Sequence, residues 1–406
     1  MLVPQPPLKC TQVSIGRFHH FHLARQLEKH LLLDSIYTGY PLWKLIDEEE
    51  IPRSKIRTFP WVQTPYMGRG KLALDRWVWL NRVWAWLAQD TLDRYVAAQL
   101  TEPGILIALS GSGLHSGRRM QQMGGYHICD RGSAHISVQN LLLRDEYKRY
   151  GLEWEGVDPR MHEKELAEYE QANFISVPSQ FCFDSFVDQG YSRAKLLKFP
   201  YGARLSRFKP AASINLPPRR DPFFILFVGH AGVQKGFIDL LDAYRLLLHP
   251  NKRLLLIGTL SSPSKELLNR SNLEGIEYLG PVPNAQLSNY YNQASVFVLP
   301  SIQEGLAMVI GEAMACGCPV IASTNTGASE LITDGQEGFV VPIRRPDMIA
   351  ERMQQLADDF HLAQRMRLAS VARMQHLQGW NQYGEMWAHF LRTLISSKEP
   401  FQQLID

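Results

Sequence analysis

Two carboxylates stand eight positions apart in one short segment, and this spacing suggests a site for an elongated ligand. Glu304 and Glu312 belong to the stretch PSIQEGLAMVIGEAMACGCPVIA, residues 300–322. The stretch begins at the end of an apolar run, VFVLPS, that is typical of a buried strand, and its own periodicity predicts a helix over residues 306–316. Eight helical positions span about 12 Å and leave the two acids about 80° apart around the axis, so both could contact one long molecule.

The start of this predicted helix is suited to bind an anion. The backbone amides from Gly305 to Ala307 have no partner inside a helix, and Gly305 has no side chain to block a ligand. Glu304 would then lie beside the anion, and Glu312 could accept hydrogen bonds from paired hydroxyl groups further along. A nucleotide sugar carries a diphosphate, a sugar and a ribose that fit these positions. The alternative is that both acids only interact favourably with the helix dipole.

Lys235 is a third residue with suitable chemistry. It lies in the segment FVGHAGVQKG, where an apolar run predicts a strand and the lysine follows in the next loop, beside a glycine. An ammonium group in such a loop is a compact charge that can neutralise phosphate. The alternative is a solvated lysine with no ligand.

Short apolar runs alternate with segments of helical periodicity along the whole chain, which predicts an α/β fold. The runs are clearest after a proline-rich stretch, residues 208–224, and less regular before it. This alternation is typical of βαβ units on parallel sheets, so we expect two Rossmann-like domains that face a central cleft. The expected divisions are an N-terminal acceptor-binding domain (1–210), a C-terminal nucleotide-sugar-binding domain (211–378) and a terminal helix that packs back on the N-terminal domain (379–406).

Composition limits the classes of function. The chain has 406 residues and a formal net charge of +3, which is too small to indicate nucleic-acid binding. Five cysteines do not make a disulfide framework, and this favours a reducing compartment. The first residues lack the apolar core of a signal peptide, and no apolar run reaches 18 residues. We therefore expect a cytoplasmic protein, with peripheral contact to the inner face of the membrane as a further expectation.

Three segments of the C-terminal half resemble one known family. They are FVGHAGVQKG, YLGPVPNAQLSNYYNQASVFVLPSIQEG and GEAMACGCPVIASTNTGASELITDGQEGFVV. These segments are similar to the nucleotide-binding domain of the retaining glycosyltransferases of family 4 (group 1), which have the two-domain GT-B fold. The resemblance is strong over residues 225–360 and weak over 175–210, and the first 150 residues match only in general architecture.

The resemblance implies a role for each matching position. Glu304 contacts the donor sugar at its reacting end, Glu312 holds the ribose, and Lys235 neutralises the diphosphate. Donor-binding groups, mostly of the backbone, are expected at Gly229, Gly280, Val282, Gly305, Leu306 and Ala307.

The chain departs from the family pattern in three places. His230 stands where many members have an arginine, so phosphate neutralisation depends more on other groups. The paired glycines near the N-terminus are absent, and we expect Gly16 to open a helix there with Arg17 as the cation. The usual Asn-Gly-Val-Asp is replaced by Tyr-Gly-Ala-Arg at 201–204, which adds a third cation at Arg204.

The N-terminal half offers further candidates within residues 108–139, at the ends of two predicted strands. Asp130 and Arg131 could bind sugar hydroxyls, and His115 or His135 could orient the acceptor. We assign Asp130 and His115 to catalysis and Arg131 and His135 to the acceptor. The alternative is a buried ion pair with turn residues.

No metal is expected. His19 and His22 have helical spacing, but such histidines without a carboxylate or cysteine partner are usually structural. The chain contains no D-x-D sequence, so cationic side chains and amides would have to neutralise the diphosphate.

A segment rich in tryptophan, residues 75–89, predicts a helix that is apolar around most of its circumference. Such a helix belongs to the core or to an interface by default. The alternative is a membrane-surface patch, since tryptophan and arginine favour that environment. A lipid-linked acceptor would suit such a surface. The four tryptophans are Trp77, Trp79, Trp84 and Trp86.

Taken with the resemblance, these residues predict a retaining, metal-independent glycosyltransferase of polysaccharide biosynthesis. It would move a sugar from a UDP- or GDP-linked donor to a saccharide or lipid-linked acceptor, with no cofactor and no nucleic-acid partner. Two alternatives use the same site: a nucleotide-sugar epimerase or hydrolase of the GT-B fold, and a non-catalytic nucleotide-sugar-binding protein.

Overall fold

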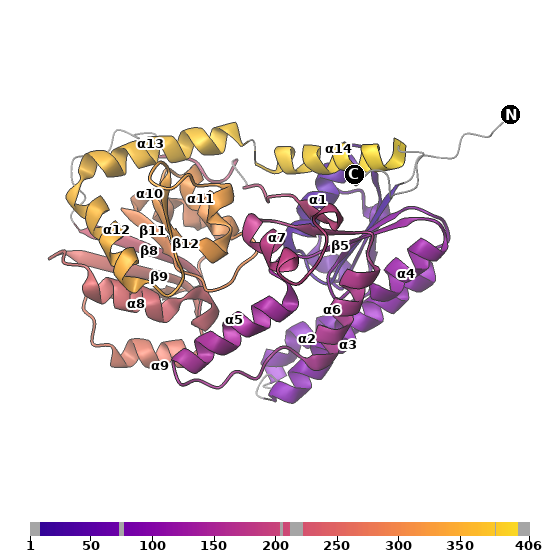
Figure 1. Cartoon of the computed structure of the whole chain (residues 1–406), viewed down its shortest axis with the longest axis horizontal. Helices are drawn as coiled ribbons and strands as arrows, with labels where there is room; N and C mark the ends of the chain where they lie inside the picture. The colour runs from indigo at the N-terminus through magenta and orange to yellow at the C-terminus, as the bar shows by residue number, and fades with distance from the viewer. Residues whose placement is uncertain (1–8, 73–76, 204–205, 212–221, 378, 397–406) are drawn as a thin grey trace.

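The protein consists of two α/β domains, each built on a parallel sheet with helices on both faces (Figure 1). The computed structural model describes residues 9–72, 77–203, 206–211, 222–377 and 379–396. Arg204, the predicted third cation, lies outside the described residues. The prediction of two Rossmann-like domains with parallel sheets is confirmed.

The N-terminal sheet has seven strands in the order β3-β2-β1-β4-β5-β6-β7. The strands are β1 (Cys10–Ser14), β2 (Leu33–Thr38), β3 (Ile56–Thr58), β4 (Ile105–Leu109), β5 (Tyr126–Asp130), β6 (Phe174–Val177) and β7 (Leu196–Lys198). The helices are α1 (Phe18–Lys29), α2 (Pro60–Gly68), α3 (Val78–Gln99), α4 (Leu114–Gln122), α5 (Ile136–Arg149), α6 (Pro159–Gln171) and α7 (Gln180–Val187). The order reverses at β1 and β4, and a parallel sheet of this kind binds ligands beyond the carboxyl ends of its strands.

The C-terminal sheet has six strands in the order β10-β9-β8-β11-β12-β13. The strands are β8 (Phe223–Ala231), β9 (Lys252–Leu260), β10 (Ile276–Gly280), β11 (Val296–Leu299), β12 (Val320–Ser323) and β13 (Gly338–Val341). The helices are α8 (Phe237–Leu246), α9 (Ser262–Arg270), α10 (Leu287–Gln293), α11 (Met308–Ala315), α12 (Pro346–Asp358) and α13 (Phe360–His376). Every residue of β11 and β12 is buried, as expected for central strands covered on both faces.

The last described helix, α14 (Trp380–Ser396), leaves the C-terminal domain and lies along the N-terminal one (Figure 1). Its buried side chains, such as Trp387 and Leu391, share one apolar core with Phe21 and Leu27 of α1. The apolar stripe of α14 therefore gains its stability from the first domain rather than from the domain that precedes it in the chain.

Two segments that pass between the domains lie against each other. A Cβ atom on Gly202 would approach the backbone carbon of Gly379 to 2.3 Å, so this contact requires glycine. The same segment continues into Tyr201, whose ring packs edge-on against Tyr383 of α14. The two connections thus form one packed unit.

The domains also meet through ion pairs at the end of α5. Arg149 contacts Asp239 of α8 at 3.1 Å, and the Tyr150 hydroxyl donates to the same carboxylate at 3.0 Å. Glu146, one turn earlier, pairs with Arg344, a residue with φ of +61° in the loop after β13. Both carboxylates are buried and both contact Arg149, so removal of this cation would leave uncompensated charge at the domain boundary.

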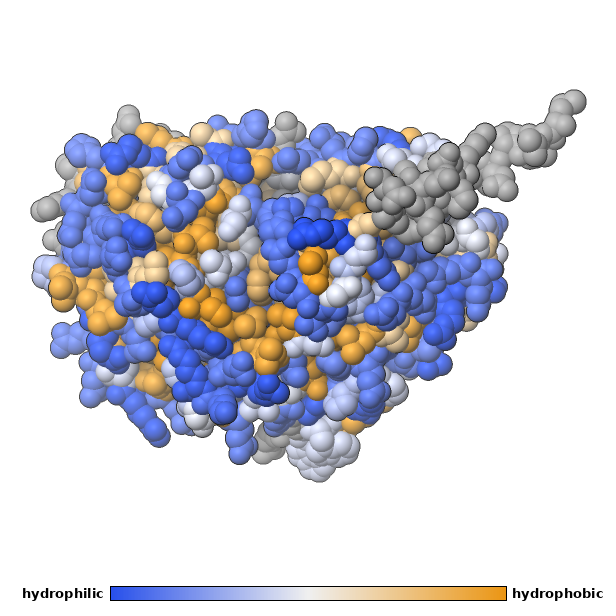
Figure 2. Space-filling model, in the orientation of Figure 1, coloured by the Kyte–Doolittle hydropathy of each residue, from blue (hydrophilic) through white to orange (hydrophobic). Residues whose placement is uncertain are grey.

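None of the described helices has the length and apolar character that a membrane crossing requires. On the face shown in Figure 2, hydrophilic residues cover most of the surface and apolar residues appear in patches between them.

Candidate functional site

Two loops at the carboxyl ends of β8 and β11 bring Lys235 and Glu304 together. The Lys235 ammonium group contacts the Glu304 carboxylate, and both side chains are only partly exposed, at 21% and 15%. The loops are joined by their backbones: the Ile302 amide donates to the Gln234 carbonyl at 2.8 Å. We refer to this contact as the Lys235–Glu304 pair.

Gly236 makes the approach of these loops possible. Its φ is +64°, and a Cβ atom there would lie 2.0 Å from the Pro300 carbonyl oxygen. Any other residue would separate the two loops. The glycine that follows Lys235 therefore positions the lysine, and this requirement is independent of any ligand.

The loop after β11 differs in one respect from the expected helix start. Helix α11 begins at Met308 rather than near Leu306, because the Ala307 amide donates to the Thr326 carbonyl at 3.0 Å. The amides of Gly305 and Leu306 have no hydrogen-bond acceptor among the described residues. Of the three predicted donors, these two are the ones that could serve a ligand.

Gly305 also contacts the other domain. A Cβ atom at Gly305 would lie 2.0 Å from the Gly132 carbonyl oxygen, and the Ser179 hydroxyl donates to the Gly305 carbonyl at 2.6 Å. Gly132 and Ser179 follow β5 and β6 of the N-terminal sheet. The loop that carries Glu304 is therefore located where the carboxyl ends of both sheets meet.

Glu312 lies on α11 in a largely buried position. The Tyr291 hydroxyl donates to it at 3.3 Å. Burial raises the pKa of the Glu312 carboxyl group to about 7, although hydrogen bonds from Tyr291 and Asn284 and the charge of Arg207 oppose this effect. Arg207 donates to the Asn284 side chain at 2.6 Å. The sequence did not identify Arg207 or Asn284, because only the fold brings them to Glu312.

The remaining C-terminal candidates lie at the ends of β8 and β10. His230 is exposed and its Nδ1 lies 2.7 Å from the Thr259 hydroxyl at the end of β9. Gly229 and Gly280 have φ values of +145° and +76°. Val282 is partly buried against the domain core.

Gly16 and Arg17 occupy the corresponding loop of the N-terminal domain, after β1. The Gly16 carbonyl accepts from the Ser14 hydroxyl, and Arg17 precedes α1 and pairs with Glu48 at 3.3 Å. A cavity of about 470 Å³ is lined by both Arg17 and Arg207. The cavity therefore extends from the N-terminal loop to the residue that neighbours Glu312.

Asp130 and Arg131 each have partners within the N-terminal domain. Asp130 accepts from the Ser176 hydroxyl at 2.7 Å and lies 2.7 Å from His19 Nε2. Burial alone would raise the pKa of Asp130, but His19 and His20 outweigh burial and hold that pKa well below its usual range. Arg131 is buried and pairs with Glu165 at 2.8 Å.

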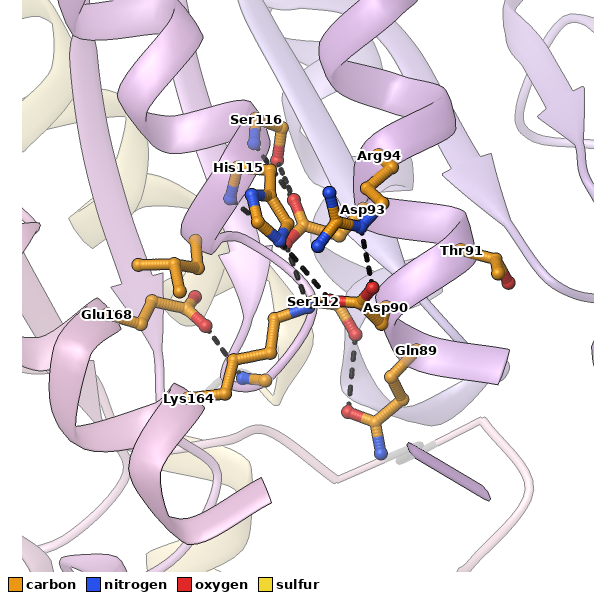
Figure 3. Close-up of polar contacts among 12 residues, drawn as sticks. Gln89, Asp90, Thr91, Asp93, Arg94, Ser112, His115, Ser116, Lys164 and Glu168 are labelled. Atoms are coloured by element: carbon orange, nitrogen blue, oxygen red, sulfur yellow. Dashed lines mark hydrogen bonds and ion pairs between the residues drawn. The ribbon is translucent and has the colours of Figure 1, made fainter. Parts of the chain in front are cut away.

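His115 belongs to a polar network between α3, α4 and α6 (Figure 3). Its Nε2 lies 3.3 Å from Asp90, and its amide donates to Asp93 at 3.0 Å. Lys164 bridges the same two carboxylates at 2.9 and 3.0 Å. The contacts of His115 thus fix the start of α4 to α3.

His135 caps the start of α5, where its Nδ1 accepts from the Ser137 amide at 3.2 Å. Burial lowers the pKa of this imidazole to about 4, and the charge of Arg131 acts in the same direction. His135 is therefore neutral at physiological pH, and only 2% of its surface is exposed.

One group among the described residues brings three potential metal ligands together. Donor atoms of His19, His20 and Asp130 all lie within 4.8 Å of one another. The contacts from Asp130 to the two Nε2 atoms measure 2.7 and 3.1 Å, lengths that also fit hydrogen bonds. His22, the partner of His19 in the sequence pattern, instead stacks on Trp380.

The comparison with known protein families concerns the C-terminal domain. Residues 209–373 match the family model for glycosyl transferases, group 1. A D-inositol 3-phosphate glycosyltransferase of Streptomyces avermitilis is 32% identical over 212 residues, which cover 47% of this chain and 45% of that protein. An enzyme of the same name from Pseudarthrobacter chlorophenolicus is 27% identical over 311 residues, which cover 72% of this chain and 68% of that protein. The first of these matches spans less than half of the relative's length.

Solved structures match the whole fold. The sucrose-phosphate synthase of Thermosynechococcus elongatus superposes with a TM-score of 0.70 at 20% identity, over 96% of this chain and 100% of that one. The Anabaena protein HepE, solved with UDP and glucose, superposes with a TM-score of 0.69 at 16% identity, over 95% of this chain and 100% of that one. The two domains therefore form the GT-B fold.

The raised pKa of Glu312 predicts a pH dependence of stability. Between the ordinary pKa of 4.5 and the folded value of about 7, the folded protein retains a proton that the unfolded chain has released. The free energy of unfolding should therefore fall through this range as pH rises, by roughly 2–3 kcal/mol from this group alone. Glu312→Gln removes this contribution.

We expect the free energy of unfolding of Glu312→Gln to rise relative to that of wild type when the pH is raised from 5 to 8. Denaturant unfolding at these two pH values measures the difference. Glu351→Gln, at an exposed position of α12, is the matched control. An equal difference between Glu312→Gln and wild type at both pH values would contradict the burial of a titrating carboxyl group.

Proposed function

We propose that this chain is a retaining glycosyltransferase that moves a sugar from a nucleoside-diphosphate sugar to a hydroxyl group of a saccharide or lipid-linked acceptor. The Lys235–Glu304 pair carries this proposal, because it places a cation and a carboxylate next to free backbone amides at the edge of the C-terminal sheet. The match of residues 209–373 to the group 1 glycosyltransferases supports the assignment.

The donor would lie along the carboxyl ends of the C-terminal strands. Lys235 and the amides of Gly305 and Leu306 would bind the diphosphate, and Glu312 would accept hydrogen bonds from the ribose. The base would lie near Gly280. We propose a UDP- or GDP-linked donor, and the UDP bound to the HepE structure favours UDP.

The remaining donor-binding positions flank this path. Gly229 and His230 would lie beside the phosphates, with Val282 and Ala307 supporting the backbone on either side. Gly16 and Arg17 would approach from the N-terminal domain, where Arg17 faces the cavity that reaches Arg207.

The chemistry would be carried mainly by charge. As the bond between the anomeric carbon and the phosphate oxygen breaks, the sugar gains oxocarbenium character and the diphosphate gains negative charge. Lys235 and the free amides would stabilise that charge without a metal ion. The acceptor oxygen would bond to the anomeric carbon on the face that the diphosphate leaves, and its proton would pass to the departing phosphate.

The N-terminal candidates would act mostly through position. Asp130, Arg131, His115 and His135 are all bound within their own domain, and we propose that they hold the loops that face the donor and the acceptor. A residue of this kind affects turnover through the geometry of its neighbours.

Incubation with a panel of UDP-, GDP- and ADP-linked sugars tests the proposal. Release of nucleoside diphosphate together with a new glycoside would support a transferase. An isomerised or hydrolysed donor without a glycoside, or binding without turnover, would contradict it.

Glu304→Gln tests the contact with the sugar. Glutamine keeps the size of the side chain and removes its charge, so we expect turnover to fall by roughly two to four powers of ten, about 3–5 kcal/mol, with UDP binding nearly unchanged. Glu277→Gln, at an exposed position of β10, is the control. Unchanged turnover in Glu304→Gln would remove this residue from the site.

Lys235→Ala tests the contact with the diphosphate. The lost charge faces phosphate, so binding of UDP should weaken by about tenfold or more while binding of uridine changes little. Titration calorimetry with both ligands measures the difference, and Lys265→Ala on the exposed face of α9 serves as the control. Equal weakening of both ligands would indicate a folding defect.

We also propose peripheral contact with a membrane through the tip of α2 and α3, which projects from the N-terminal domain (Figure 1). The surface of this tip carries residues of intermediate hydropathy (Figure 2). Trp77 and Trp79 are 57% and 63% exposed there. Trp86 lies under the Arg160 guanidinium group at 4.9 Å, so we assign the membrane contact to Trp77 and Trp79. Arg76, a cation next to these tryptophans in the sequence, lies outside the described residues.

The membrane proposal predicts that the protein co-sediments with anionic liposomes at low salt and is released at high salt. Each lysine or arginine near the membrane surface adds about 1 kcal/mol to the free energy of binding to anionic lipid, and salt screens this attraction. Trp77→Ser combined with Trp79→Ser should reduce co-sedimentation without unfolding the chain. Trp43→Ser, at another exposed position, is the matched control. Unchanged binding in the double variant, or no binding by wild type, would rule out this surface.

A further inference from the structure

His19 differs from the other buried histidines of the N-terminal domain in how its two nitrogens are used. Nε2 lies 2.7 Å from Asp130 and 3.2 Å from the Tyr201 hydroxyl, and the imidazole stacks on the Tyr201 ring with a centroid distance of 4.3 Å. In the neutral imidazole, the tautomer in which Nε2 donates to Asp130 leaves the free electron pair on Nδ1.

The Nδ1 atom has no hydrogen-bond partner among the described residues, yet it is not sealed from solvent. Both nitrogens of His20 are buried and make no hydrogen bond of good geometry, although Nε2 lies 3.1 Å from Asp130, whereas neither nitrogen of His19 belongs to that group. His19 is 6% exposed and His20 is fully buried. A small polar group can therefore reach His19 and cannot reach His20.

The free edge of His19 points to the place where the two domains meet. A Cβ atom on Gly132 would lie 3.2 Å from His19 Cε1 and 3.7 Å from Nδ1. Gly132 in turn touches Gly305, which follows Glu304 in the chain. A chain of contacts therefore crosses the domain boundary. His19 lies beside Gly132, Gly132 touches Gly305, and Gly305 follows Glu304 in the chain.

We propose that His19 is a substrate-binding residue of the N-terminal domain, whose Nδ1 accepts a hydrogen bond from a hydroxyl group of the transferred sugar. Asp130 is its positioning residue, since it holds the ring and the tautomer. The inference rests on the proposed function, which places the sugar beside Glu304. No bond is made or broken by His19 in this role.

The test uses the full chain and a panel of UDP-, GDP- and ADP-linked sugars, with UDP-glucose as the first probe. His19→Ala should lower turnover about 10- to 100-fold and change UDP binding by less than about twofold, because His19 is proposed to contact the transferred sugar, which UDP lacks. His22→Ala, on the same helix with its ring on Trp380, should retain wild-type turnover.

Deoxy donors identify the hydroxyl group. For the sugar that wild type consumes, one deoxy form should reduce wild-type turnover and cause no further loss in His19→Ala, because the interaction is already absent. If His19→Ala fails to bind UDP, His19→Phe, which keeps an aromatic ring against Tyr201 but has no hydrogen-bond acceptor, replaces it in the same cycle. Asp130→Asn should show the same non-additivity with a smaller loss.

Four results would overturn the inference. Wild-type turnover by His19→Ala would do so, as would equal losses for every deoxy donor in both proteins. A stoichiometric metal in wild type that is lost in both His19→Ala and His20→Ala would make the cluster a metal site. If the wild-type protein turns over no sugar of the panel, both the proposed function and this inference are overturned. The other three results overturn the inference alone.

Discussion

The close approach of two glycine backbones, at Gly132 and Gly305, is the constraint on which the candidate site depends. A single added carbon at Gly305 would lie 2.0 Å from the Gly132 carbonyl oxygen, so the loop that carries Glu304 can meet the N-terminal domain only without a side chain. Gly236 imposes the same condition inside the C-terminal domain, against Pro300. The backbone at Glu304 is therefore fixed from both directions, and Lys235 contacts its carboxylate.

The relative position of the domains has a separate cause, which lies away from that contact. The ion pairs of Glu146 and Arg149 on α5 link the domains on one side, and the packing of Gly202 with Gly379 joins the two chain connections. Buried ion pairs add little net stability compared with apolar packing, but they penalise any arrangement that separates their charges. They therefore contribute most to the specificity of the domain arrangement, while the apolar face of α14 contributes stability.

The sequence predicts the elements that carry continuous apolar runs and misses those that do not. The runs before Lys235 and Glu304 appear as β8 and β11, and the two residues proposed for the donor site lie together although 69 positions separate them. Strand β1, CTQVS, is fully buried, but three of its five residues are polar and two of these are adjacent, so neither an apolar run nor a regular alternation reveals it. The pairing of His19 with Asp130, 111 positions apart, is likewise beyond reach, because only the order of β1, β4 and β5 brings these residues together.

The cations of the site are distributed in a way that departs from a simple positive pocket. Lys235 contacts Glu304, Arg17 contacts Glu48, and Arg207 lies near Glu312, so each cation has an acidic neighbour. A diphosphate would therefore share these cations with carboxylates, and a lysine can do so because its ammonium group has three donors. Because His230 stands in place of an arginine, the free amides of Gly305 and Leu306 would contribute more to phosphate binding in the proposed site. Those amides are fixed by the contact between Gly305 and Gly132, so binding of the leaving group would be coupled to the closeness of the two domains.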